Sequence, residues 1–334
     1  MKGRIYLLLV IAAFSFGCSE TKDCEKCDEL DLEEEIESNE STFEIVDSPS
    51  LVILGTIQDA GSPQINCHKE CCEQLHDNPD LTRMVVSIGI VDPENQKKYI
   101  LEASPDMSEQ LADLSQYENF SDTDIPDGVF LTHAHIGHYT GLMDFGKEAI
   151  SASDVPVYAM PRMKEFLSTN GPWDQLVTNK NITIHDLKNE EEVVLTTHLK
   201  IVPFTVPHRD EYSETVGFKI IGPNKSALFI PDIDKWDKWE KDIVEEVAKV
   251  DYAFLDATFY DFGELGDRDM NNVPHPLITQ TIELFRDQEP SEKSKIYFIH
   301  FNHTNPILNS QLDAKIVTTT AAFNVAQKGL VLGL

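Results

Sequence analysis

The stretch Thr132-His133-Ala134-His135-Ile136-Gly137-His138-Tyr139-Thr140-Gly141-Leu142 places three histidines within six residues. It follows Gly128-Val129-Phe130-Leu131, a short apolar run that predicts a buried strand. Neutral imidazole is the commonest metal-binding side chain, and a strand end holds such ligands rigidly while leaving space for a substrate. We therefore predict a metal site here, in preference to a histidine-rich surface turn.

His133, His135 and His138 match the three histidines of an HxHxDH motif, and through them the chain resembles the metallo-β-lactamase fold superfamily. The resemblance implies an α/β fold, a four-layer αββα sandwich with one or two metal ions at one edge of its sheets. Gly137 departs from the motif, because the family has a metal-binding aspartate at this position. We therefore expect a weaker second site, and we expect Gly137→Asp to strengthen it.

Potential metal ligands also follow three later β-rich runs of the sequence, namely His208, Asp232 and His300. In the resembled family, ligands occupy matching positions at strand ends, and an aspartate lies between the two ions. The first ligand set that the resemblance implies is His133, His135 and His208, completed by Asp232 or a water. The second is His138, His300 and bridging Asp232.

Three protein nitrogens with an open further position are typical of a catalytic zinc ion. We predict zinc as the cofactor, with iron as the alternative, and we predict Asp232 and His275 as catalytic residues, the latter as a general acid. Asp59 and Asp256 are candidates to orient a histidine ligand, or are structural carboxylates. Arg209 either binds an anionic substrate or is an exposed side chain.

A second candidate metal site is rich in cysteine. The run Pro63-Gln64-Ile65-Asn66-Cys67 and the later Asn302–Pro306 segment are similar to stretches of the pyrroloquinoline quinone biosynthesis protein B (PqqB) branch. That branch and its phosphodiesterase relatives carry a structural zinc near this point. The resemblance makes Cys67, Cys71 and Cys72 candidate ligands, with His303, His68 or His76 as the fourth. A loop or vicinal disulfide is the alternative.

The N-terminus predicts export and a lipid anchor. Residues 1–17 combine a basic start with an apolar run too short to span a membrane, as in a signal peptide. Small residues before Cys18 resemble a lipobox, which implies lipidation of Cys18. Residues 18–49 are strongly acidic and predict a solvated tether, leaving 50–334 as one domain. We therefore expect a lipoprotein of the bacterial cell envelope, attached to the membrane only through Cys18.

The composition excludes one class of partner. The chain has 27 basic and 58 acidic residues and a formal net charge of −31. Nucleic acid is repelled by such a field, so a small-molecule substrate is expected, and the oligomeric state stays open. A metal-dependent hydrolase of a small ester, phosphodiester or lactone is the first hypothesis. A PqqB-like oxygenase of quinone cofactor formation and a non-catalytic metal-binding protein are the alternatives.

Overall fold

The computed structural model describes residues 43–264, 266, 269, 272–308 and 313–334. In this part of the chain the strands form two seven-stranded sheets. The strands of the first sheet, in spatial order, are β14 (Val331–Gly333), β1 (Ser50–Gly55), β2 (Ser87–Asp92), β3 (Lys97–Leu101), β4 (Gly128–Phe130), β5 (Val155–Ala159) and β6 (Ile182–Asp186). Those of the second sheet are β13 (Asn324–Val325), β12 (Ile296–Ile299), β11 (Tyr252–Asp256), β10 (Ser226–Ile230), β9 (Val216–Ile221), β8 (Lys200–Thr205) and β7 (Val193–Val194).

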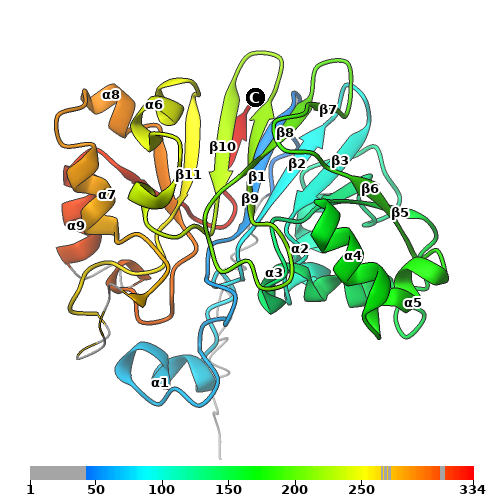
Figure 1. Cartoon of the computed structure of the whole chain (residues 1–334), viewed down its shortest axis with the longest axis horizontal. Coiled ribbons are helices and arrows are strands. Elements are labelled where there is room, and N and C mark those ends of the chain that lie inside the picture. The colour runs from blue at the N-terminus through cyan, green and yellow to red at the C-terminus, as the bar shows by residue number, and fades with distance from the viewer. Residues whose placement is uncertain (1–42, 265, 267–268, 270–271, 309–312) are drawn as a thin grey trace, which may run out of the picture. The chain divides into compact units, whose positions relative to one another are not determined.

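Helices cover the outer faces of both sheets (Figure 1). The α-helices described are α1 (Glu70–Asp77), α2 (Met107–Ser115), α3 (Ile136–Tyr139), α4 (Pro161–Thr169), α5 (Trp173–Thr178), α6 (Ile243–Ala248), α7 (Ile278–Leu284), α8 (Pro290–Lys293) and α9 (Asp313–Thr320). The 3₁₀ helices are η1 (Thr140–Phe145), η2 (Trp236–Lys238) and η4 (Pro306–Leu308).

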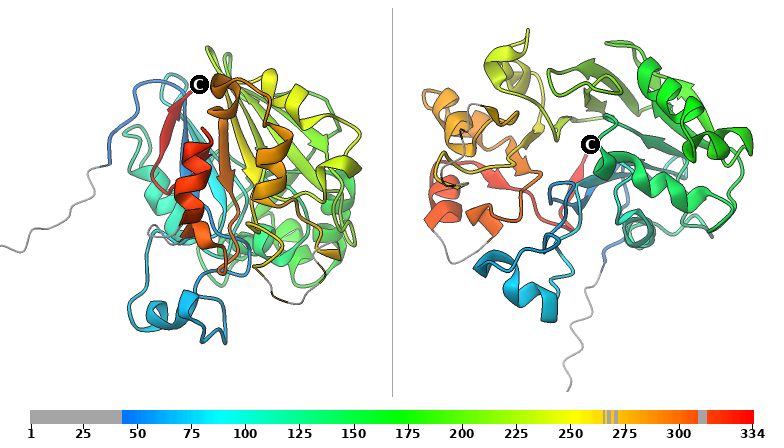
Figure 2. Two further views of the ribbon diagram at one scale, coloured as in Figure 1. Left: turned by 90° about the vertical axis from the view of Figure 1, so that its left-hand side faces the viewer. Right: turned by 60° about the horizontal axis from the view of Figure 1, so that its bottom comes forward.

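Successive apolar side chains along a strand point alternately into two different cores. On β1, Leu51 and Ile53 join the core between the sheets, whereas Val52 and Leu54 join the core beneath α2 and α4. This is the two-residue period of a strand that is buried on both faces. A third core lies beneath α6, α7 and α9, and Figure 2 shows the orange and red helices α7 and α9 against the second sheet. The predicted αββα sandwich is confirmed.

The strand directions bring the predicted ligands together. β10, β11 and β12 run parallel, so their carboxyl ends lie at one edge of the second sheet. β3 and β4 are likewise parallel in the first sheet. In open α/β sheets, ligands bind outside the carboxyl ends of parallel strands. Asp232 follows β10, His300 follows β12, and the triple-histidine motif follows β4.

The apolar spacing of residues 234–249 predicts one amphipathic helix, and this prediction is wrong. The segment forms only η2 and α6, because Asp242 ends the intervening turn by accepting hydrogen bonds from the N–H groups of Val244 and Glu245. This N-cap starts a new helix. The helical spacing of Trp236 and Trp239 predicts a packing role, which is confirmed because both side chains are buried.

Residues 274–286 also predict a helix, opened by His275 in a loop, and the observed helix is shorter. It begins at Ile278, so His275 lies in the preceding loop. His275 is therefore a loop residue and not part of α7.

A buried ion pair fixes the connection between α2 and the strand before the metal motif. Lys98 on β3 and Glu118 have side chains that are each 1% exposed, and their charged atoms lie 2.9 Å apart. The Lys98 ammonium also donates to the hydroxyl of Ser115 and the carbonyl of Thr123. It thereby holds the segment that enters β4.

We predict that Lys98→Met lowers the free energy of unfolding by about 3–5 kcal/mol, because it leaves the Glu118 carboxylate buried without its partner. Lys97→Met is the matched control, since Lys97 pairs with Asp127 but its side chain is 44% exposed. That change should cost about 1 kcal/mol or less. Urea unfolding measures both, and equal effects would contradict the buried pair's role.

The same pair should make stability depend on pH. Burial raises the pKa of Glu118, but hydrogen bonds from Lys98 and from the N–H groups of Phe120 and Ser121 outweigh it and hold the pKa below its ordinary value. Such a carboxylate contributes stability above its unfolded-state pKa of about 4.3. The contribution is lost as pH falls through the lower folded-state value. Unfolding free energies of wild type and Glu118→Gln, measured across this acid range, should converge, and parallel curves would contradict the assignment.

Candidate metal centre

The first predicted ligand set is assembled from three separate loops. His133 and His135 lie between β4 and α3, His208 follows β8, and Asp232 follows β10. These four residues form a group whose potential ligand atoms all lie within 4.8 Å of one another. His208 Nε2 lies 3.3 Å from His135 Nδ1. The geometry therefore fits one metal ion held by three histidines and a carboxylate.

Asp232 lies between this group and the second predicted ligand set. One carboxylate oxygen, Oδ2, is 3.3 Å from His133 Nε2 and 3.7 Å from His138 Nε2. The other, Oδ1, is 3.3 Å from His208 Nε2 and 3.2 Å from His275 Nδ1. Asp232 itself is 3% exposed. A carboxylate in this place can contact two neighbouring cations at once.

Unpaired ring nitrogens test whether these residues fit a metal. Among the residues described, Nε2 of His133, His138 and His300 is buried without a hydrogen-bond partner. A buried polar atom without a partner costs about 1–3 kcal/mol, and most such atoms in native proteins are paired. Three of them around one carboxylate are accounted for by metal ligation, so the donor set fits the metal that the fold implies.

Electrostatics keep two of these groups in metal-binding form. Burial, aided by neighbouring His138, lowers the pKa of His133 well below its ordinary value, which favours neutral imidazole. Burial acts to raise the pKa of Asp232, but His208 and His275 outweigh it and hold that pKa well below the ordinary range. A neutral imidazole and an ionised carboxylate are the ligand forms that bind zinc.

Carboxylates orient two of the histidines. Glu102, fully buried at the end of β3, lies 3.3 Å from His138 Nδ1 and accepts a hydrogen bond from Thr132. Glu211 lies 3.2 Å from His135 Nε2. Sequence reasoning missed both glutamates. The position of Glu102 directly after a β-run, where other ligands lie, was the available signal, whereas Glu211 had none.

A hydrogen-bonded chain fixes His300. Thr258 Oγ1 lies 2.8 Å from His300 Nδ1 and donates to Asp256 Oδ1 at 2.6 Å. Nδ1 of His300 is therefore occupied, and its Nε2 is left for a ligand. Residue His300 also has φ of 69°, a strained conformation of the kind that clusters at functional sites. This places Asp256 in the orienting role that the sequence left open.

His275 reaches the centre from the loop before α7. Its Nδ1 lies 2.9 Å from Asp256 Oδ2 as well as close to Asp232. Burial lowers the pKa of His275, but these two carboxylates outweigh it and raise the pKa to about 10. The side chain is 11% exposed, so one edge of the imidazole remains accessible.

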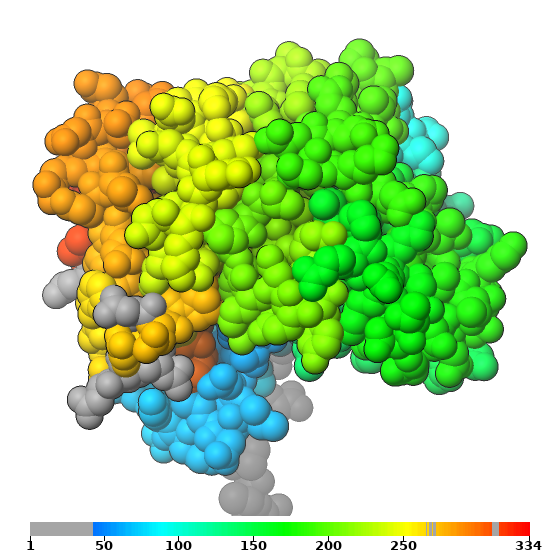
Figure 3. All heavy atoms as spheres, in the orientation of Figure 1, coloured from blue at the N-terminus to red at the C-terminus, as the bar shows by residue number. Residues whose placement is uncertain are grey.

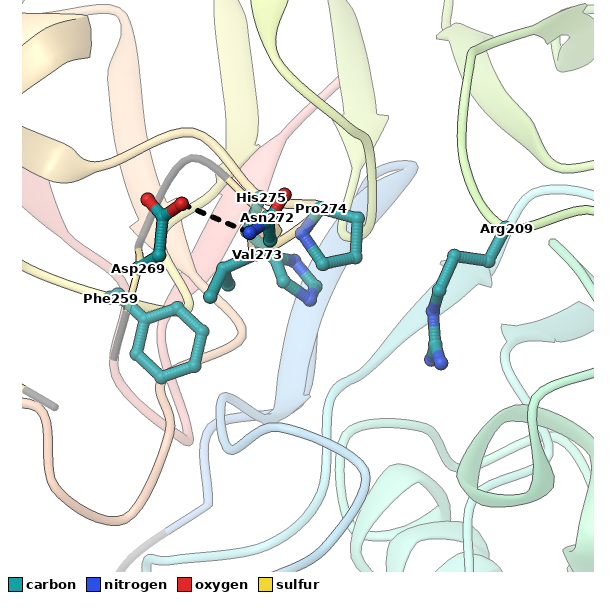
Figure 4. A pocket seen from close by; sticks show the side chains of 7 residues that line it. All are labelled: Arg209, Phe259, Asp269, Asn272, Val273, Pro274 and His275. Carbon is teal, nitrogen blue, oxygen red and sulfur yellow. Dashed lines mark hydrogen bonds between the residues drawn. The ribbon is translucent and has the colours of Figure 1, made fainter. Parts of the chain in front are cut away.

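A cavity of about 340 Å³ opens beside His275. Figure 4 shows His275, Pro274 and Phe259 on one side of it and Arg209 on the opposite side. Arg209 is exposed and lines the same cavity as His275. The cavity is large enough for a small molecule.

The predicted cysteine site is also assembled. Cys67, Cys71, Cys72 and His303 form a group with ligand atoms within 4.8 Å of one another. The sulfurs of Cys67 and Cys71, and of Cys71 and Cys72, are 3.9 Å apart, too far for a disulfide. In the described part of the chain this group includes neither His68 nor His76. Figure 3 shows the blue segment that carries α1 projecting from the surface.

The expectation that Gly137→Asp strengthens the second site is wrong. A Cβ atom at position 137 would lie 2.1 Å from Asp59 Cβ and 2.7 Å from the Asp59 carbonyl oxygen. Contacts this short require the backbone of the first loop to move. The missing aspartate of the motif therefore cannot be restored in place.

We predict that Thr258→Val weakens zinc binding about 10- to 100-fold, the usual effect of removing a group that orients a histidine ligand. Valine keeps the shape of threonine but cannot bridge His300 and Asp256. Competition with a zinc-binding dye measures the affinity. Thr319→Val, on the exposed part of α9, is the control. Equal affinities in the two variants would contradict the role of Thr258.

Comparisons with known proteins agree with this geometry. The family model described as beta-lactamase superfamily domain matches residues 97–301. Coenzyme PQQ synthesis protein B of Acinetobacter baylyi is 23% identical over 306 residues, with 84% of this chain and 98% of the relative covered. The protein of the same name from Methylorubrum extorquens strain PA1 is 26% identical over 314 residues, with 85% and 99% covered.

Solved structures share the fold. A zinc-bound crystal structure of PqqB from Methylobacterium extorquens superposes with a TM-score of 0.70 at 23% identity, covering 85% of this chain and all of that one. A diphosphatase of the PhnP family gives a TM-score of 0.59 at 22% identity, covering 85% and 96%.

The predicted envelope localisation is wrong by these comparisons. The relatives named above are proteins of coenzyme synthesis, and the match accounts for 98% to 99% of their length but only 84% to 85% of this chain. Neither relative supports a lipid-anchored N-terminal segment. The predicted signal peptide, Cys18 and the tether up to residue 42 lie outside the described residues.

The described residues contain no helix that is long and apolar enough to cross a membrane. The family match covers more than half of the chain and includes the triple-histidine motif and the loops that deliver His208, Asp232 and His300. The chain therefore belongs to the beta-lactamase superfamily, in its metallo-β-lactamase fold, and is similar to the PqqB proteins.

Proposed function

We propose that this protein is a metal-dependent hydrolase of a small anionic ester, with a phosphodiester as the substrate class that the site fits best. One observation carries the proposal. Three histidines and a buried carboxylate converge, and the cavity next to them is lined by His275, whose Nδ1 lies 3.2 Å from that carboxylate, and by Arg209, which follows the ligand His208. A purely structural metal site is closed by its ligands, whereas this one adjoins space for a substrate.

His133, His135, His208 and Asp232 would hold the first ion. When bound, zinc would supply a Lewis acid for the phosphoryl oxygen and make hydroxide available near neutral pH. The buried Asp232 carboxylate also faces the region where a water molecule would attack, and can orient that water through a hydrogen bond. The histidines fix the place of attack relative to the cavity.

His275 is placed to act as the general acid. Its Nδ1 is engaged by Asp256 and Asp232, so Nε2 is the ring atom left to meet a substrate. As the P–O bond breaks, Nε2 would donate its proton to the departing oxygen. The Asp256 carboxylate stabilises the imidazolium and holds its ring orientation, as a buried acid does beside a catalytic histidine.

Arg209 favours an anionic substrate. It follows His208 directly and lines the cavity opposite His275 (Figure 4). A guanidinium can bind two oxygens of a phosphate at once. The PhnP-family protein of similar fold is a diphosphatase, so a phosphate compound is a substrate of one protein with this fold.

We predict zinc-dependent hydrolysis of bis(4-nitrophenyl) phosphate. Arg209→Ala should lower kcat/KM for this substrate, mainly by raising KM. An exposed cation elsewhere, Lys188, provides the control variant Lys188→Ala. Rates are followed by nitrophenolate release after removal and return of zinc. A fully zinc-loaded protein that hydrolyses neither this compound nor a panel of carboxylic esters would overturn the proposal.

We predict that His275→Gln lowers kcat by a factor of about 10² to 10⁴, the usual contribution of a general acid. The loss should be large for an alkyl leaving group and small for 4-nitrophenolate, since nitrophenolate departs without protonation. Zinc content, measured on the same samples, should be unchanged. An equal loss on both substrates would assign His275 a role in positioning instead.

Oxidation is the second candidate function, because the curated relatives are coenzyme PQQ synthesis proteins. Histidine and carboxylate ligands also suit iron. Elemental analysis of the purified protein separates the two candidates when it is paired with an oxygen electrode. Iron content and oxygen consumption with a quinone precursor would favour oxidation, whereas zinc without oxygen consumption favours hydrolysis.

A further inference from the structure

Asp59 and Gly137 occupy nearly the same space. A Cβ atom at Gly137 would lie 2.1 Å from the Cβ of Asp59, so the carboxylate of Asp59 starts almost where a side chain at 137 would start. In the HxHxDH motif, position 137 carries an acidic metal ligand. The first loop therefore brings a carboxylate to the place from which the motif's own carboxylate is absent.

The main chain holds Asp59 beside His300. Gln58 donates its backbone N–H to the carbonyl of Phe301 at 2.9 Å, and Phe301 donates its N–H to the carbonyl of Thr56 at 2.8 Å. These two bonds tie the loop that carries Asp59 to the residue that follows His300. The Gln58 amide also donates to the Asp59 carboxylate. The position of Asp59 is thus set by the backbone.

The two histidines that face Asp59 have free ligand atoms. A carboxylate oxygen of Asp59 and one ring nitrogen each of His138 and His300 lie within 4.8 Å of one another. Both histidines are fully buried, and Nε2 of each has no hydrogen-bond partner. With only the shared Asp232 carboxylate, a divalent ion between His138 and His300 would be poorly compensated in charge.

We propose that Asp59 is the acidic ligand of the second metal ion, together with His138, His300 and the bridging Asp232. Glycine at 137 then has a structural reason, because any larger residue would displace Asp59. The inference rests on the proposed metal-dependent function in one respect only, that the histidine cluster binds metal. Asp59 in the first loop thus supplies the carboxylate ligand that the motif lacks at Gly137.

The test counts zinc bound at a fixed free zinc concentration. A His133→Ala/His138→Ala variant sets the baseline, since it should retain only the cysteine site. Asp59→Asn keeps the shape of aspartate without its charge, and should bind about one zinc fewer than wild type or bind it at least about tenfold more weakly. Asp122→Asn is the matched control, an exposed aspartate outside all the ligand groups. It should bind as wild type does.

The outcomes separate this inference from the proposed function. A wild type that holds no more zinc than the baseline variant overturns both. A wild type that fills the histidine sites, with Asp59→Asn filling them equally, overturns the role of Asp59 alone. If metal-free Asp59→Asn has a lower melting temperature than metal-free wild type, zinc binding is measured on Asp59→Ser instead, because serine is smaller. Gly137→Ala should lose the same ion, because it displaces Asp59.

Discussion

The buried carboxylate of Asp232 is the constraint on which the site depends. It is 3% exposed, yet it lies within 3.7 Å of ring nitrogens of His133, His138, His208 and His275. An isolated carboxylate so deep in a protein would be strongly unfavourable. The surrounding imidazoles, and the metal that their free nitrogens imply, compensate for its charge. The three segments that carry these histidines, the motif after β4, the loop after β8 and the loop before α7, therefore have to converge on the end of β10.

The sandwich architecture makes that convergence possible. The two sheets share the core between them, and their strand ends open at one edge, where the motif after β4 meets the loops after β10, β11 and β12. Rigid strands position each ligand, while the loops remain open toward the cavity beside Arg209 and His275. The same edge supplies the groups that orient the ligands. Asp256 and Thr258 fix His300, and Glu102 faces His138.

Burial and hydrogen bonding assign different protonation states to neighbouring side chains. Burial leaves His300 with a pKa lowered to about 4, whereas two carboxylates raise that of His275 to about 10 despite its burial. One imidazole is thus suited to bind a cation and the other to hold a proton. Pairs of groups whose pKa values are driven apart in this way are typical of active sites.

The sequence by itself determined the fold and the first ligand set. The match of His133, His135 and His138 to the HxHxDH motif carried that information, because the resemblance implies both the fold and the ligands at the ends of later strands, among them His208 and Asp232. Local patterns were less reliable for helices. The 234–249 segment has helical spacing, yet the Asp242 cap and the burial of two tryptophans divide it.

Only the tertiary structure decided how Gly137 is compensated. Asp59 lies 78 positions earlier in the chain, and its nearness to Gly137 depends on backbone pairing between the first loop and Phe301. The same holds for Glu102, Glu211 and His303, whose partners are distant in sequence. The sequence motif shows that the acidic ligand expected at position 137 is missing. The space that the missing side chain leaves, and the residue that fills it, are set by contacts between segments that only folding brings together.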